Sequence, residues 1–430
     1  MRDFALPDPR ILSLAIARMV SALANSFLVV VLPLYIGSGA VRLPAVTGST
    51  VTVAGASIAV SLELLIAVVL SLFGFLNSLS QPLTGSLSDR LGRRKPFLLF
   101  GLGLVATGSA GYLFFTDYLL VLAMRGLQGV GAAFSIPITV ALVNELSGPD
   151  ERGSNFGLFN TFRLLGFGIG PLVAGVVVAA GPYAALGRPV SGFDAAFLVA
   201  VAGAAVSFAL ITLLITDPER AEEAAAEDIS IRVRGENGGL DPVFALGVAT
   251  VVMALSIAIY APLANVINER LNQGSFLYSV QFGATVFANV LFQLPLGRLS
   301  DRYGRRPFLV AGFLLLLPTT LAQGLVTSST AMIAARFLQG VAVAAVFAPS
   351  LALAGDLARE GTSGSTLSIL TMGFGLGIAF GTLLSGVLVS YGFVVPFAAA
   401  TAAGAIGLLL VLTQVSDPGA EDGVVAPAAE

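Results

Sequence analysis

The sequence predicts an all-α membrane protein with twelve transmembrane helices in two pseudo-symmetric six-helix bundles. One reason is composition: of 430 residues, 56% are hydrophobic and 11% are charged, whereas an average soluble domain carries about 25% charged residues. Another is that apolar stretches of about 20 residues recur along the whole chain, each long enough to cross a hydrocarbon core about 30 Å thick. A third is an internal duplication of two sequence motifs.

The chain contains no Cys and no His, which removes thiol nucleophiles, imidazole bases and the usual zinc or haem ligands. No P-loop follows a strand and no G-x-S-x-G motif occurs, so ATP hydrolysis is not supported. We therefore expect no enzymatic activity, no cofactor, no metal site and no nucleic-acid partner.

Six spans are expected in the first half of the chain, separated by polar residues, Gly and Pro. The first is too long for a signal-peptide core and is followed by no A-x-A-like cleavage site, so we expect it to be retained. The six spans cover residues 11–35, 62–83, 97–115, 119–143, 156–180 and 193–216.

A polar segment, residues 217–241, then interrupts the apolar pattern with eight acids and three arginines. Its composition predicts a cytoplasmic linker. It separates a first six-helix half, residues 1–216, from a second half with a short cytoplasmic tail, residues 242–430. The spans of the second half cover residues 243–267, 276–296, 308–327, 331–353, 366–390 and 394–415.

The distribution of basic residues predicts the orientation. With both termini in the cytoplasm, 16 of the 22 Lys and Arg residues lie on the cytoplasmic side, and three lie outside: Arg42, Arg188 and Arg270. Cytoplasmic loops carry the excess of Lys and Arg. We expect an integral protein of the plasma membrane with both termini cytoplasmic.

Two motifs recur at nearly the same offset. The segment GSLSDRLGRR at residues 85–94 returns as GRLSDRYGRR at 297–306, which is 212 residues later, and RGLQG at 125–129 returns as RFLQG at 336–340, which is 211 residues later. Two matches at one offset indicate a duplication of the six-helix unit. Parallel repeats place a substrate path at the interface of the halves, near the bilayer midplane.

The first motif combines spaced Gly and Asp with a basic run. Gly85 and Gly92 suit a close helix approach and a tight turn, and a carboxylate at Asp89 is favourable against the N-terminus of a neighbouring helix. A plain positive cytoplasmic loop would explain the arginines but not this spacing. The motif residues are Gly85, Asp89, Arg90, Gly92, Arg93 and Arg94 in the first copy and Gly297, Asp301, Arg302, Gly304 and Arg305 in the second.

This pattern resembles the cytoplasmic signature loop of the major facilitator superfamily. The resemblance implies that Asp89 and its basic neighbours latch the two halves together in the outward-open state. It implies a weaker version of the same role for Asp301.

An arginine lies deep in the fourth span of each half. Arg125 and Gln128 resemble the family's fourth-helix arginine motif, and Arg336 and Gln339 repeat them. A cation inside an apolar span is costly unless it faces water or a partner, so we expect these residues to face the translocation path. The alternative is a structural arginine that pairs with backbone carbonyls or reaches the nearer interface.

The fifth span carries Gly157, Gly166, Gly170, Pro171 and Gly175. Their spacing resembles the antiporter signature of drug/proton exporters, except that Ala174 replaces one glycine. The glycines allow two helices to touch, and the proline permits a kink. The equivalent stretch of the second half, residues 377–386, has Thr382 in place of the proline. Ordinary Gly-rich packing is the alternative reading.

Other polar residues interrupt the apolar spans. They are Asn77 and Gln81 on one face of the second span, their repeats Asn289 and Gln293, and Asn25 and Arg163 in the first and fifth spans. Polar side chains in such helices turn inward, where they line a path or hydrogen-bond to neighbouring helices.

The family resemblance implies a secondary active transporter that works by alternating access, with the lipid bilayer and a small-molecule substrate as partners. The antiporter-like motif favours proton-coupled efflux of small organic compounds or drugs by a monomer. However, no acid or His lies deep in a span, and Glu63 is the nearest carboxylate. The alternative is uptake or exchange of an organic anion, for which the three embedded arginines without matching acids argue. A nontransporting membrane receptor is the remote third reading, and the family's sugar-porter signature is missing after the sixth span.

Overall fold

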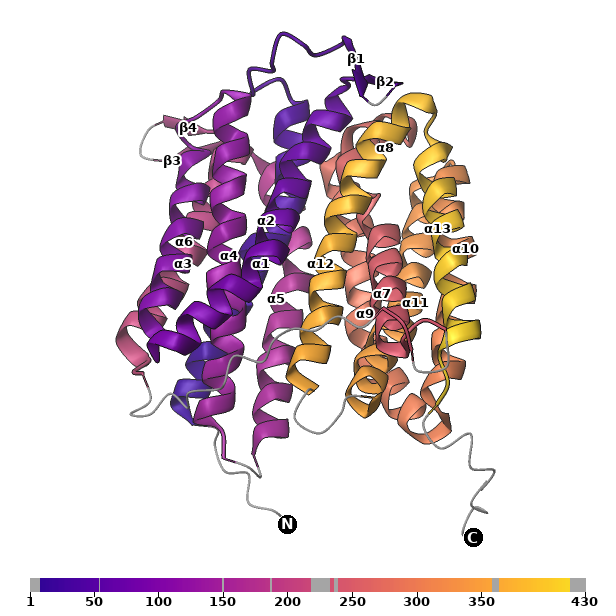
Figure 1. The fold of residues 1–430 in the computed structure, drawn as a ribbon. Coiled ribbons are helices and arrows are strands. Elements are labelled where there is room, and N and C mark those ends of the chain that lie inside the picture. The colour runs from indigo at the N-terminus through magenta and orange to yellow at the C-terminus, as the bar shows by residue number, and fades with distance from the viewer. Residues whose placement is uncertain are drawn as a thin grey trace.

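The computed structural model describes residues 8–53, 55–148, 151–185, 188–217, 233–235, 239–357 and 363–417. Long helices run side by side between two ends of the molecule (Figure 1). At one end the first helix begins and the last helix ends, and we call it the terminus end. The opposite end carries two short β-hairpins, and we call it the hairpin end.

The first half contains six long helices and both hairpins. The helices are α1 (Pro9–Gly37), α2 (Leu62–Leu91), α3 (Lys95–Gly111), α4 (Tyr118–Leu146), α5 (Arg152–Ala180) and α6 (Gly192–Leu214). The antiparallel hairpins pair β1 (Thr50–Val53) with β2 (Ala56–Ala59) and β3 (Tyr183–Ala185) with β4 (Arg188–Val190). The sequence did not predict these hairpins, because strands of three or four residues show no clear alternation.

The second half contains six further helical segments that reach from end to end. They are α7 (Pro242–Ala258) with η1 (Ala261–Leu263) and α8 (Ala264–Arg270), α9 (Ser275–Tyr303), α10 (Arg305–Leu325), α11 (Ser329–Leu357), α12 (Ser363–Leu388) with η2 (Val389–Tyr391), and α13 (Val394–Gln414). Among the described residues, eleven helical segments are long and apolar enough to cross a membrane. The twelfth, α3, has 17 residues. The expected twelve-helix architecture is confirmed.

Two expectations about boundaries need correction. The span at residues 243–267 was expected to be one helix, but α7 ends at Ala258 and the chain passes through η1 into α8. Pro262 lies in η1 and cannot donate a backbone hydrogen bond, which explains the break. The signature element was expected to be a loop, yet most of it extends α2 and α9, and the chain turns only at Gly92 and Gly304, with φ of 57° and 93°. Glycine is favoured at such angles.

The first helix of each half starts in the same way. Asp8 and Asp241 each precede a proline and accept a backbone N–H with the side chain, from Arg10 and from Val243, both at 2.8 Å. A carboxylate cap satisfies amides that have no partner inside the helix, and proline fits the first helical position. The Asp-Pro pair therefore marks the helix start in both halves.

Within each half the helices follow one packing scheme, in which α1 packs on α5 and α6, α3 on α4 and α6, and α2 on α4. In the second half, α7 packs on α12 and α13, α10 on α11 and α13, and α9 on α11. Between the halves, α2 packs on α12 and α5 on α9. Gly175 lies against Ser279 in the second of these contacts, and Asn265 of α8 donates a hydrogen bond to the Pro33 carbonyl at 3.1 Å.

The buried cores show where the halves meet. At the hairpin end, one cluster joins residues of both halves, for example Phe27 of α1 and Tyr260 beyond α7. At the terminus end each half has its own cluster, around Leu142 in the first half and Leu353 in the second. Among the described residues, the halves therefore share a buried hydrophobic cluster at the hairpin end and not at the terminus end.

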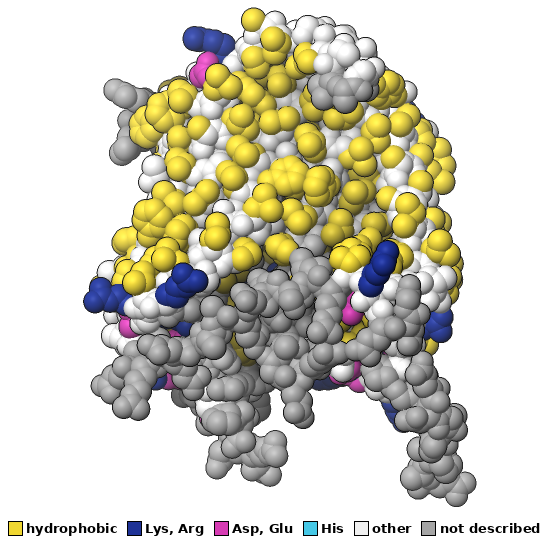
Figure 2. Space-filling view, viewed as in Figure 1, with side chains coloured by type: hydrophobic (Ala, Val, Ile, Leu, Met, Phe, Trp, Pro, Cys, Tyr) yellow, Lys and Arg dark blue, Asp and Glu magenta, His cyan; other side chains and the backbone are white. Residues whose placement is uncertain are grey.

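Hydrophobic side chains cover the middle of the molecule in the view of Figure 2, and the charged side chains visible there lie towards its two ends. Large apolar residues such as Leu83, Phe114 and Leu213 are exposed on the described molecule. A surface of this kind is stable only against lipid.

Candidate translocation site

Arg125 lies in a closed polar cluster of the first half. It is 1% exposed, and its Nη1 donates to Gln128 Oε1 at 2.9 Å. Gln128 Nε2 in turn donates to Ser109 Oγ of α3 at 3.0 Å, and the Tyr112 hydroxyl donates to Gln128 Oε1 at 3.2 Å. The guanidinium carbon lies 4.3 Å from the ring centroid of Phe73 on α2, within range for a cation–π contact. The cluster thus ties α4 to α2 and α3.

Arg336 has the same arrangement in the second half. It is 0% exposed, and its Nη1 donates to Gln339 Oε1 at 2.7 Å. Gln339 Nε2 donates to Thr320 Oγ1 of α10 at 3.1 Å, and Gln323 accepts from the arginine at 3.5 Å. The ring of Tyr260 lies 4.1 Å from the guanidinium carbon.

The two clusters are related by the duplication. Ser109 and Thr320 differ by 211 positions, which is the offset between Arg125 and Arg336. Each arginine donates to neutral groups of its own half, although Arg125 Nε and Arg336 Nη2 are buried without a hydrogen-bond partner among the described residues, and neither side chain is open to solvent in this conformation. The role in the path that the sequence suggested for them stays a prediction.

A further polar network lies beside Arg336 at the hairpin end. Gln281 Nε2 donates to Gln273 Oε1 at 2.7 Å, and the Tyr260 hydroxyl donates to Gln281 Oε1 at 2.5 Å. The hydroxyl of Ser329 also donates to Gln273, at 2.6 Å. Neither glutamine was singled out from the sequence: Gln273 lies between the predicted spans, and Gln281, inside the span 276–296, belongs to neither repeated motif.

The remaining polar candidates differ in their surroundings. Gln81 Nε2 donates to Asn77 Oδ1 at 3.1 Å, so this pair is partly satisfied within α2. The side-chain oxygens of Asn25 and Gln293 are buried without a hydrogen-bond partner among the described residues. Asn289 is half-buried. Buried oxygens without partners cost free energy, so they indicate places where water or a ligand is needed.

Two other arginines lie in the middle of first-half helices. Arg18 is the tenth residue of α1 and Arg163 the twelfth of α5, and they are close enough for their charges to repel. Arg163 donates through Nε and Nη2 to Asn160 Oδ1, at 3.0 and 2.8 Å. Arg18 was not singled out from the sequence, because it lies near the start of a predicted span and resembles a cytoplasmic flanking charge.

The described helices hold acids only near their ends. Each of these acids lies within three residues of a helix end, and they are Glu63, Asp89, Glu145, Asp194, Glu269, Asp301 and Asp356. No group of three potential metal ligands occurs in the part of the chain that the structure describes. The middle of the helices therefore carries positive charge without matching acids.

The glycines of the antiporter-like motif pack α5 on α1. A Cβ at Gly166 would collide with the Met19 carbonyl oxygen, and one at Gly170 would collide with Ser26. Gly157 has nothing within 4 Å and makes no such contact. The equivalent glycines of α12, Gly377 and Gly381, lie as closely on the backbone of α7. Pro171 lies inside α5, which continues past it.

The signature elements lie at the terminus end. Arg94 donates through Nη2 and Nε to Glu145 Oε1 at 2.6 and 3.0 Å. In the second half Arg305 pairs with Asp301 and, at 3.3 Å, with Asp356. Arg90, Arg93 and Arg302 are exposed, and the side chain of Asp89 lies outside the described part.

Close helix contact was expected at Gly85, but no atom would lie within 4 Å of a Cβ there, and Gly297 has only Ala348 at 3.9 Å. The expectation fails in this conformation because the halves share no core at the terminus end.

Two aspartates at this end were missed from the sequence. Asp217, just after α6, accepts the backbone N–H groups of Arg94 and Lys95 at 3.1 and 2.7 Å. Asp417, just after α13, accepts that of Arg305 at 2.9 Å. A carboxylate at a helix N-terminus is favoured by the unpaired amides and the helix dipole.

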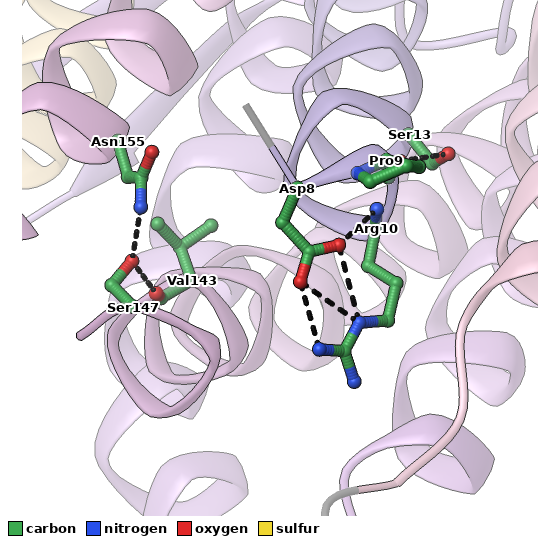
Figure 3. A network of polar contacts seen from close by, with 7 residues as sticks. All are labelled: Asp8, Pro9, Arg10, Ser13, Val143, Ser147 and Asn155. Carbon is green, nitrogen blue, oxygen red and sulfur yellow. Dashed lines mark hydrogen bonds and ion pairs between the residues drawn. The ribbon is translucent and has the colours of Figure 1, made fainter. Parts of the chain in front are cut away.

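Figure 3 shows further polar contacts at the terminus end of the first half. The Asp8 carboxylate accepts from the Arg10 side chain at 2.7 to 3.2 Å, and this hydrogen-bonded guanidinium lowers the pKa of Asp8 below its usual value. Asn155 of α5 donates to Ser147 Oγ at 3.0 Å, which ties the end of α4 to α5.

The helices, the apolar surface and the mid-helix charges define a polytopic α-helical membrane protein with two related halves. The family model described as Major Facilitator Superfamily matches residues 14–239 and 246–430. The chain belongs to the major facilitator superfamily.

Comparison with known proteins adds three similarities. Citrate exporter 1 of Aspergillus niger is 33% identical over 108 residues, 25% of this chain and 20% of that protein. Multidrug transporter AQR1 of Candida glabrata is 29% identical over 137 residues, 32% of this chain and 21% of that protein. The matches thus span about a fifth of either relative's length. The crystal structure of the human organic anion transporter MFSD10 (TETRAN) matches with a TM-score of 0.67 at 21% identity, covering 95% of this chain and 100% of that chain, which shows the shared fold.

Proposed function

We propose that this chain is a secondary active transporter that moves small organic anions across a membrane by alternating access of its two halves. The observation that carries the proposal is the charge of the helix interiors. Among the described helices, Arg18, Arg125, Arg163 and Arg336 lie away from the helix ends, whereas acids lie only near the ends. A buried cation without a matching acid is costly, and an anionic substrate would offset that cost.

Two of the similar proteins support the same substrate class. One is named as a citrate exporter, and the other is titled an organic anion transporter. The match to the first covers a quarter of this chain, and the likeness to the second is one of fold. These similarities therefore add to the charge argument and do not replace it.

The second candidate is proton-coupled efflux of drugs or other small organic compounds. The glycine and proline pattern of α5 and the similarity to a multidrug transporter favour it. Proton coupling needs a titratable group in the path, and the described helix interiors offer none with a carboxylate. We therefore rank it second.

We further propose that the protein is a monomer of the plasma membrane and that its terminus end faces the cytoplasm. Residues 1–216 and 242–430 form the two moving halves, and residues 217–241 form the linker between them. In that orientation the shared core at the hairpin end corresponds to an inward-open state. A cysteine at Arg42 should react with an impermeant thiol reagent outside intact cells, and one at Gly235 should not. The chain has no native Cys to obscure the result.

Counterflow in proteoliposomes tests the substrate class. Vesicles loaded with unlabelled citrate should accumulate labelled citrate faster than protein-free vesicles, and vesicles loaded with the cationic dye ethidium should not exchange it. Ethidium transport that requires a pH gradient, with no exchange of citrate, malate or benzoate, would overturn the proposal and establish the second candidate.

A further inference from the structure

The four mid-helix arginines fall into two classes. Arg125 and Arg336 are enclosed, and each is held by a glutamine three residues later and by an aromatic ring. Arg18 and Arg163 are half-buried, so part of each residue lies at the surface of the described structure. A substrate can contact Arg18 and Arg163 without disrupting the helix packing within the first half.

Arg18 has no hydrogen-bond or ion-pair partner among the described residues. The nearest acid along α1, Asp8, is engaged by Arg10 at 2.7 Å. Burial of a charge is costly, and Arg18 makes no hydrogen bond or ion pair that would offset this cost. The stability of the fold therefore does not explain why an arginine occupies this position. Its position therefore points to a partner that the folded chain itself does not supply.

A small cavity adjoins Arg18 between α1, α3, α4 and α6, and its other polar lining is Ser21, Ser135 and Thr139. All three hydroxyls already donate elsewhere: Ser21 to Ser207 Oγ, Ser135 to a backbone carbonyl and Thr139 to the Ser135 carbonyl. The cavity has room for about one water molecule and is not lined by Arg163, and the donors at this place that have no acceptor belong to the Arg18 guanidinium.

Arg163 lies close to Arg18 across the α1–α5 contact. Its Nε and Nη2 share a single neutral acceptor, Asn160 Oδ1, which leaves its positive charge uncompensated. The packing of Gly166 on Met19 places the two arginines near the same level of these helices. Two like charges in one place disfavour each other, so the pair favours an anion between them.

The second half lacks such a pair. Gly377 packs on the Val251 carbonyl as Gly166 packs on that of Met19, so Thr250 takes the place of Arg18. Phe374, three residues before Gly377, takes the place of Arg163. The charged pair is therefore not part of the duplicated scaffold.

We propose that Arg18 and Arg163 together form a carboxylate-binding subsite on the first half, suited to di- and tricarboxylates that place one carboxylate on each guanidinium. This assignment rests on the proposed transport of organic anions. Arginine binds carboxylate with two parallel hydrogen bonds, which lysine cannot reproduce.

The test compares Arg18→Gln, Arg163→Gln and Arg18→Lys with wild type. The exposed Arg10→Gln is the control, because Arg10 is paired with Asp8 at the start of α1. Uptake of succinate or citrate by either Gln variant should show a half-saturation concentration raised about 10- to 100-fold, with a smaller rise for benzoate. Arg18→Lys should recover part of the loss, and Arg10→Gln should behave as wild type.

Thermal unfolding of the detergent-solubilised protein supplies an independent measurement. If Arg18 or Arg163 carries an uncompensated charge, its removal should raise the unfolding midpoint of the substrate-free protein and abolish the further increase of that midpoint when citrate is added. If the arginine is structural, its removal should lower the unfolding midpoint. An unchanged half-saturation concentration in both Gln variants, or a lowered midpoint with an intact citrate shift, would overturn the subsite and leave anion transport standing. Absence of citrate, succinate and benzoate transport by wild type would instead overturn the proposed function.

Discussion

The two halves share a scaffold and differ in where they carry unpaired charge. In both, a mid-helix arginine donates to a glutamine three residues later, and that glutamine reaches a hydroxyl of the neighbouring helix. Only the first half adds Arg18 and Arg163 at the contact of its first and fifth helices, where the second half has Thr250 and Phe374. The duplicated features hold helices together, whereas the unduplicated pair forms the proposed carboxylate subsite.

The largest expected effects concern the duplicated arginines. Arg125→Ala and Arg336→Ala each remove a charged hydrogen bond and a cation–π contact and leave a buried glutamine short of a partner. We expect a loss of about 2–4 kcal/mol in the free energy of unfolding, larger for Arg336 because Gln323 is a further partner, and loss of transport in both. Thermal unfolding in detergent and flux in proteoliposomes measure these effects. Normal flux through the alanine variants would remove both residues from the mechanism.

The glycine contacts come next. Gly166→Ala and Gly377→Ala both force a methyl group onto the backbone of the partner helix, which costs about 1–3 kcal/mol. We expect similar losses of stability in the two halves, because the contact is the same. Gly157→Ala is the control, since nothing lies within 4 Å of the added carbon. A loss of pH-gradient dependence without loss of stability, confined to Gly166→Ala, would show that the motif serves antiport and not packing.

The ion pairs at the terminus end should differ between halves. The side chains of Arg94 and Glu145 are 4% and 12% exposed, whereas those of Arg305 and Asp356 are 17% and 47% exposed. A double-mutant cycle with Glu145→Gln and Arg94→Gln should give a coupling of about 1–3 kcal/mol. The cycle with Asp356→Asn and Arg305→Gln should give less than about 1 kcal/mol. Equal couplings would contradict the difference in burial.

The smallest expected effect concerns the helix caps. Asp8→Ala and Asp241→Ala should each cost about 1 kcal/mol, and the first should also remove a pH dependence that follows from Arg10. Because the pKa of Asp8 is lowered in the folded protein, its contribution is present above the unfolded value, about 3.9, and is lost as the pH falls through the lower folded value. Unfolding midpoints between pH 3 and 6 for both variants and wild type would measure it. If Asp8→Ala left the pH dependence of the unfolding midpoint unchanged, that dependence would not arise from the Asp8–Arg10 pair.

Much of the fold could be predicted because membrane spans depend on local composition. The helix boundaries were less predictable: α2 and α9 continue through charged residues such as Asp301, since a helix can extend beyond the apolar core into water. The hairpins and the break at Pro262 depend on loop contacts that hydropathy does not report.

The candidate site was only partly predictable. The repeat offset identified Arg125 and Arg336, but their hydroxyl partners on α3 and α10 are set by tertiary register. Asp217 was hidden in an acidic segment, although a Thr-Asp-Pro at 216–218 and a Ser-Asp-Pro at 416–418 repeat at the ends of the two halves. Capping by these aspartates could not be foreseen, because it requires the end of α6 to return to the start of α3.

The glycine contact between α1 and α5 determines what can move. Because Gly166 and Gly170 rest on the backbone of α1, sliding one helix along the other would require a step of a full turn, about 5.4 Å. In the proposed alternating-access cycle the two helices would therefore travel as one piece, and the spacing of Arg18 and Arg163 would stay constant. A ligand would then be released when water reaches the Arg18–Arg163 pair or when groups of the opposite half approach the pair. An increase in the distance between the two arginines would not be the cause.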